Sequence, residues 1–105
     1  MSLHSPFTKK IKNVVHQDYP EAKVILYGSR ARGDYKKESD WDILVLLDQA
    51  TVNFKEEQKI RHKLYPIELE TGQSISTFVY SLNDWNTRLS VTPLHRNVIR
   101  EGIFL

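Results

Sequence analysis

Two short apolar runs with polar residues at their ends constrain this fold more than any other feature. The first run, residues 24–27, ends at Gly28 and Ser29, and a second run opens with Asp40 and Asp42. Continuous apolar runs bounded by turn residues are typical of strands that are buried on both faces. Because side chains alternate along a strand, we expect Asp40 and Asp42 to face the same way. The polar ends of two buried strands are therefore the first place to look for chemistry.

These residue types suit a site for magnesium and a triphosphate. Two neighbouring carboxylates repel one another unless a cation lies between them, and Mg²⁺ is commonly bound by one or two carboxylates and completed by phosphates. Gly28 allows a ligand to approach the backbone closely, and Ser29 at the start of a short helix offers a hydroxyl and free N–H groups to phosphate. Taken separately, a Gly-Ser-Arg turn or an Asp-x-Asp pair is also common as a solvated turn or helix cap.

The combined pattern resembles a known family. Gly28-Ser29-Arg30-Ala31-Arg32-Gly33, followed by Ser39-Asp40-Trp41-Asp42-Ile43-Leu44-Val45, is similar to the signature of the DNA polymerase beta superfamily of nucleotidyltransferases. Within it, this short chain resembles the minimal nucleotidyltransferases, whose members include antitoxins paired with HEPN-domain toxins. The resemblance implies an α/β (α+β) nucleotidyltransferase fold, with a short mixed β-sheet and helices packed on one face.

The resemblance also implies a reaction and a set of site residues. A hydroxyl would attack the α-phosphorus of a nucleoside triphosphate, with ATP as the expected substrate and Mg²⁺ as the expected cofactor. The expected acceptor is a partner protein such as a HEPN toxin. The site implied in this way comprises Asp40 and Asp42 as catalytic and metal-binding residues, and Gly28, Ser29, Arg30, Arg32 and Ser39 as nucleotide-binding residues.

A third carboxylate, which the family carries on the next strand, is missing from the expected strand at residues 74–81. Ser76 is the expected occupant of its position, and Glu68 or Glu70 upstream is a candidate substitute. Three functions therefore stay open. The chain is an active nucleotidyltransferase, an impaired antitoxin-like module that binds nucleotide or a partner, or a small-molecule adenylyltransferase of the aminoglycoside-modifying kind.

Composition limits the remaining classes. With 105 residues, the chain is expected to form one nucleotidyltransferase domain, 1–105, in which residues 1–4 are a loose leader. A net charge of +2 argues against nucleic-acid binding, and the absence of cysteine excludes disulfides and thiolate metal sites. With no long apolar run and no signal-peptide pattern, we expect a cytoplasmic protein. The sequence leaves the oligomeric state open.

Capping residues and apolar periodicity predict alternating helices and strands. The expected elements are a helix from Ser5 to Asp18, a strand from Ala22 to Tyr27, a helical turn from Arg30 to Asp34, a strand from Trp41 to Leu47, a helix from Asn53 that Pro66 interrupts before Gly72, a strand from Ser74 to Ser81, a turn from Ser81 to Trp85 with Trp85 over the core, a helix from Thr92 to Gly102, and an apolar tail after it.

Overall fold

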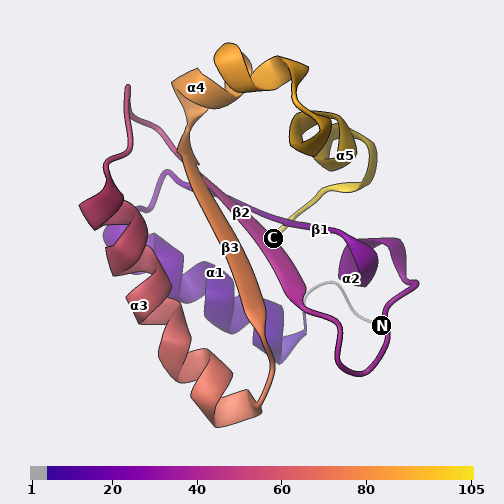
Figure 1. Ribbon diagram of the computed structural model, residues 1–105. Helices are drawn as coiled ribbons and strands as arrows, with labels where there is room; N and C mark the ends of the chain where they lie inside the picture. The colour runs from indigo at the N-terminus through magenta and orange to yellow at the C-terminus, as the bar shows by residue number, and fades with distance from the viewer. Residues whose placement is uncertain (1–4) are drawn as a thin grey trace.

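The computed structural model describes residues 5–105, and in this part of the chain four strands form one mixed sheet (Figure 1). The predicted leader, residues 1–4, lies outside the described residues. The strands are β1 (Lys23–Tyr27), β2 (Trp41–Leu47), β3 (Ile75–Ser81) and β4 (Ile103–Phe104), in the order β3-β2-β1-β4. β1 pairs antiparallel with β2 and β4, whereas β2 and β3 are parallel. The mixed sheet confirms the expected α/β fold class.

Two helices cover one face of the sheet, as expected. α1 (Pro6–Asp18) begins with Ser5, whose hydroxyl accepts a hydrogen bond from the Thr8 N–H. α3 (Phe54–Thr71) begins with a capping box in which Asn53 and Glu56 bond to one another's backbone N–H. The apolar sides of these helices meet the sheet in a buried core that includes Ile11, Val15, Leu26, Ile43, Val45, Ile60 and Leu64.

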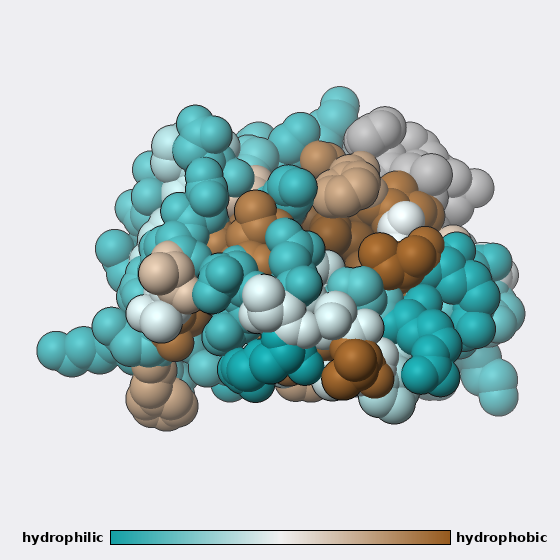
Figure 2. All heavy atoms as spheres, turned by 90° about the horizontal axis from the view of Figure 1, so that it is seen from above, coloured by the Kyte–Doolittle hydropathy of each residue, from teal (hydrophilic) through white to brown (hydrophobic). Residues whose placement is uncertain are grey.

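The opposite face of the sheet is only partly covered. α4 (Leu82–Asn86), a 3₁₀ turn (Arg88–Val91) and α5 (Pro93–Glu101) lie over its upper part in Figure 1, away from the start of β2. Trp85 is 4% exposed in a second cluster with Ile25, Leu46 and Val98, which confirms its predicted place over the core. Seen from above, the molecule shows apolar side chains exposed among polar ones (Figure 2).

Two local predictions were wrong. α3 runs unbroken through Pro66, because Pro66 and the residue four positions before it, His62, are both exposed, so that water can bond to the carbonyl that lacks a helical partner. The expected turn after β3 is instead the short helix α4, whose Asp84 N–H donates to the Ser81 hydroxyl. Neither difference changes the sheet.

The apolar tail packs as an edge strand. β4 pairs with β1 in the register Ile25 to Phe104 and Leu26 to Ile103, so the end of α5 lies beside the end of β1. No helix within residues 5–105 is both long and apolar enough to cross a membrane.

Candidate active site

The turn after β1 and the start of β2 are in direct contact. Tyr27 pairs with Asp42 across the two antiparallel strands, so Gly28 lies beside the Asp42 side chain. Gly28 has φ +74° and ψ −160°, a backbone conformation that is essentially restricted to glycine. A Cβ atom at this position would lie 2.1 Å from Asp42 Oδ2. The absence of a side chain at Gly28 is therefore what allows the carboxylate to lie against the turn.

Ser29 begins the short helix α2 (Ser29–Arg32), which follows this turn directly. The N–H groups of Ala31 and Arg32, the last two residues of α2, bond back to the Gly28 carbonyl. Within residues 5–105 the Ser29 hydroxyl makes no hydrogen bond, so it remains available to a ligand. Gly33 then ends the helix in the left-handed conformation.

Asp42 is a half-buried carboxylate in a crowded negative environment. Burial is the main cause that raises its pKa above the usual value, and repulsion from Asp40 raises it further. The positive charge of Arg32 opposes the shift, and the negative charge of Glu101 adds to it. A divalent cation at Asp40 and Asp42 would relieve this repulsion.

The carboxylates of Asp40 and Asp42 are suitable ligands for magnesium. Asp40 is exposed and directly precedes β2. It lies close enough to Asp42 for its negative charge to raise the pKa of Asp42. Among residues 5–105 no group of three acidic or histidine side chains is placed to hold a metal ion. Two carboxylates whose remaining positions are completed by water and substrate phosphates are a usual magnesium arrangement.

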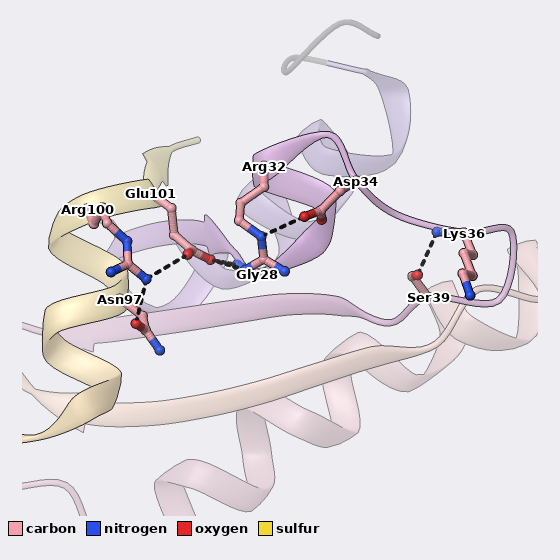
Figure 3. Close-up of polar contacts among 8 residues, drawn as sticks. All are labelled: Gly28, Arg32, Asp34, Lys36, Ser39, Asn97, Arg100 and Glu101. Atoms are coloured by element: carbon pink, nitrogen blue, oxygen red, sulfur yellow. Dashed lines mark hydrogen bonds and ion pairs between the residues drawn. The ribbon is translucent and has the colours of Figure 1, made fainter.

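Arg32 is the arginine that the structure brings to the carboxylates. Its Nε donates to Asp34 Oδ2 at 3.1 Å, and its Nη1 donates to Glu101 Oε2 at 2.9 Å (Figure 3). Its positive charge also lowers the pKa of Asp42, against the other causes. The predicted nucleotide-binding role of Arg32 is therefore compatible with its position.

Arg30 has a different environment from the one predicted for it. Only 7% of it is exposed, and its guanidinium lies 4.3 Å from the Tyr35 ring centre and 4.7 Å from that of Trp41. Trp41 belongs to the core on the α1 side, opposite to the face that Asp42 occupies. The structure thus places Arg30 on the opposite side of the strand from Asp42 and makes it a support for the loop.

Ser39 belongs to the same loop. Its carbonyl accepts hydrogen bonds from Arg30 Nε and Nη2, at 3.3 and 3.1 Å. Its hydroxyl accepts one from the Lys36 N–H at 2.8 Å (Figure 3). Both contacts shape the approach to β2, and the predicted nucleotide-binding role of Ser39 stays a prediction.

The expected third carboxylate is not found on β3. Ser76 is the register partner of Asp42 on this strand, so a neutral hydroxyl lies next to the acid. The two candidate substitutes make other contacts. Glu68 Oε2 accepts from the Ile75 N–H at 3.2 Å, and Glu70 pairs with Lys10 at 2.7 Å.

Glu101 is an acid near the site that no motif indicated. Its side chain is 8% exposed, and its Oε2 accepts a hydrogen bond from the Gly28 N–H at 2.6 Å (Figure 3). The contact joins residues far apart in the chain and depends on the pairing of β4 with β1. The apolar tail Ile103-Phe104-Leu105 was the one signal from which that pairing might have been inferred.

The mixed sheet and the contact between a glycine–serine turn and paired aspartates define the class of protein. The nucleotidyltransferase domain family matches residues 8–101 of the chain. The chain belongs to this family and is a transferase.

The chain is also similar to two curated proteins and to solved structures. It is 41% identical over 80 residues to "Putative protein adenylyltransferase MJ0604" of Methanocaldococcus jannaschii, which covers 76% of this chain and 73% of the relative. It is 43% identical over 58 residues to "Putative protein adenylyltransferase MJ0141" of the same organism, covering 55% of this chain and 58% of the relative. Among solved structures, a toxin–antitoxin crystallised with AMP-PNP has a TM-score of 0.66 at 21% identity, covering 91% of this chain and 69% of that one. At this identity the likeness shows the fold alone.

Proposed function

We propose that this chain transfers AMP from ATP to a hydroxyl group of a partner protein, with Mg²⁺ held by Asp40 and Asp42. The observation that carries the proposal is the contact between Asp42 and Gly28, which joins a metal-binding acid to a phosphate-binding turn. The names of the two curated relatives, both protein adenylyltransferases, support AMP as the group transferred and a protein as the acceptor.

Each site residue has a distinct task in this reaction. Gly28 and Ser29 bind the phosphates, and Arg32 adds a positive charge beside them. The acceptor hydroxyl attacks the α-phosphorus, a new P–O bond forms, the bond to the β-phosphate breaks, and pyrophosphate leaves as the hydroxyl proton passes to solvent. Bound Mg²⁺ would supply charge neutralisation on the triphosphate and orient its leaving group.

The acceptor would approach the open part of the sheet. In Figure 1, α4 and α5 lie away from the start of β2, the end of the strand to which Asp42 belongs. The resemblance to minimal nucleotidyltransferases makes a HEPN-domain protein the partner to test first. A toxin–antitoxin is also the subject of the similar solved structure, although that likeness concerns the fold.

Labelled ATP provides the test. We would incubate the chain and Mg²⁺ with a purified HEPN-domain protein, using ATP labelled in the α-phosphate or, separately, in the γ-phosphate. Label from the α-phosphate alone should appear on the partner, with release of pyrophosphate and a mass increase of one adenylyl group. Asp40→Asn with Asp42→Asn should abolish the transfer. Transfer of γ-label, or α-label transfer that persists in the double variant, would refute the assignment.

A second candidate function rests on β3. Because Ser76 brings no charge beside Asp42, a module that binds Mg²⁺ and nucleotide without turnover is the alternative. Asp42-dependent binding of ATP without pyrophosphate release, with the HEPN-domain protein or aminoglycosides present as acceptors, would favour this module. Pyrophosphate release only with an aminoglycoside would instead identify a small-molecule adenylyltransferase.

A further inference from the structure

Glu101 is a buried carboxylate to which the proposed reaction assigns no task. α5 ends at this residue, and the pairing of β4 with β1 brings it beside Gly28. Its Oε2 accepts hydrogen bonds from the Gly28 N–H at 2.6 Å and from Arg32 Nη1 at 2.9 Å (Figure 3). One carboxylate oxygen therefore joins the turn and the arginine that are proposed to bind the nucleotide.

Two features of the placement of Glu101 are unfavourable for folding, although its Oε2 is well bonded. Its side chain is 8% exposed, and its Oε1 is buried without a hydrogen-bond partner in residues 5–105, with Arg100 Nη2 3.9 Å away. Its negative charge also repels that of Asp42 and raises the pKa of Asp42. An unpaired buried oxygen and a neighbour of like charge both oppose folding. Stability alone therefore does not explain an acid at this position.

The contacts of Arg32 indicate what the acid does. Asp34 holds its Nε at 3.1 Å, and Glu101 holds its Nη1 at 2.9 Å. Because the guanidinium is planar and its five N–H donors form a rigid fork, fixing two nitrogens also fixes the third. Within residues 5–105 Nη2 has no partner, and the Arg32 side chain is 46% exposed. The fork therefore presents free N–H groups to a ligand in a set orientation.

We propose that Glu101 is a positioning residue, which holds the Arg32 guanidinium and the Gly28 turn in the geometry that receives the triphosphate. The inference rests on the proposed function and adds a residue to the same site. Glu101 acts through Arg32 and the Gly28 N–H and does not touch the nucleotide. If Glu101 instead occupied the place of a phosphate, removing it would strengthen binding, so the sign of the change separates the two roles.

A double-mutant cycle tests the positioning role. Calorimetry would measure the affinity of Mg²⁺–tripolyphosphate and Mg²⁺–ATP for the wild type, Glu101→Ala, Arg32→Ala and the double variant. We expect each single substitution to weaken both ligands about tenfold, the effect of losing one hydrogen bond to a charged group. In the double variant, loss of Glu101 should cost less affinity than it does in the wild type, because only its contact with the Gly28 N–H remains to be lost, whereas a merely structural role would make the two losses add in full.

Two further variants control for charge and folding. Glu101→Gln keeps an oxygen that can accept from the Gly28 N–H but loses the negative charge that holds Arg32, so its affinity should fall by about threefold, less than in Glu101→Ala. If Glu101→Ala fails to fold, the direction of the affinity change in Glu101→Gln still separates the two roles. Glu70→Ala removes a carboxylate that is 65% exposed and paired with Lys10 at 2.7 Å, away from the turn, and should leave affinity unchanged.

The outcomes separate this inference from the function on which it rests. If the wild type binds neither ligand, the proposed function fails and the role of Glu101 fails with it. If the wild type binds but the two Glu101 variants bind equally well or more tightly, the positioning role alone is overturned. Additive losses in the cycle overturn it as well.

Discussion

Replacing Gly28 with alanine tests the central contact of the site. The φ of +74° and ψ of −160° at Gly28 lie in a region that other residues occupy at a cost of about 1–3 kcal/mol. In addition, the new methyl group would lie 2.1 Å from Asp42 Oδ2 and 3.0 Å from Asp42 Cγ, so the carboxylate must move. We expect the free energy of unfolding of Gly28→Ala to fall by at least the cost of this strain. We also expect the variant to lose Mg²⁺-dependent ATP binding.

Gly72→Ala is the matched control. Gly72 ends α3 with φ +71° and ψ 6°, and a Cβ there would meet nothing within 4 Å. Alanine in this left-handed conformation costs about 1–2 kcal/mol of backbone strain. The control should therefore be destabilised through the backbone alone and should bind Mg²⁺–ATP as the wild type does.

Urea unfolding and calorimetric titration of ATP would measure both effects. With a urea dependence of about 1–3 kcal/mol per molar for a small protein, the strain in either variant shifts the midpoint by roughly 1 M. In an Asp42→Ala background the clash disappears, so Gly28→Ala should then cost only the strain. Wild-type affinity for Mg²⁺–ATP in Gly28→Ala would refute the placing of Asp42 in the site.

Three further predictions concern the carboxylates. Asp40→Asn with Asp42→Asn should abolish Mg²⁺-dependent ATP binding in a titration while circular dichroism shows an intact fold, and unfolding of the variant would make the pair structural. Ser76→Asp should raise pyrophosphate release if a missing acid limits turnover, and no change would count against Ser76 as the third position. Because the pKa of Asp42 is raised on folding, its contribution to stability falls as pH rises from the unfolded value near 4 through the folded value. Urea unfolding should therefore find Asp42→Asn more stable than wild type at about pH 7, with the gain disappearing near pH 3, and a gain independent of pH would exclude titration of Asp42 as its cause.

The elements that the sequence predicted correctly depend on local signals. Ser5 and Asn53 cap their helices by bonds to the next turn, and the apolar run of β2 is buried on both faces as its composition required. The contact between Gly28 and Asp42 also follows from the antiparallel pairing of two consecutive strands, in which Tyr27 is the partner of Asp42. The site residues remain predictions, but these short-range features were sufficient to bring the turn and one acid together.

The parts that were missed depend on the tertiary environment. Whether an arginine in the motif faces phosphate or packs against aromatic rings is decided by the surrounding side chains, and Arg30 lies against Tyr35 and Trp41. The helical signal around Pro66 was broken in the sequence but not in the structure, because solvent can satisfy the freed carbonyl. Glu101 reaches Gly28 only through the β1–β4 pairing, which two residues of β4 specify weakly.

The charges at the site also indicate how ligand binding and stability are coupled. Asp40, Asp42 and Glu101 raise the negative potential around one turn, and Arg32 is the cation that opposes it at Asp42. Folding without ligand must hold these like charges together, whereas bound Mg²⁺–ATP would add both a cation for the aspartates and phosphates for Arg32. A ligand that binds only the folded state at a hundred times its Kd adds about 2.7 kcal/mol to the free energy of unfolding. The acids that weaken the free fold are thus the groups through which substrate would stabilise it.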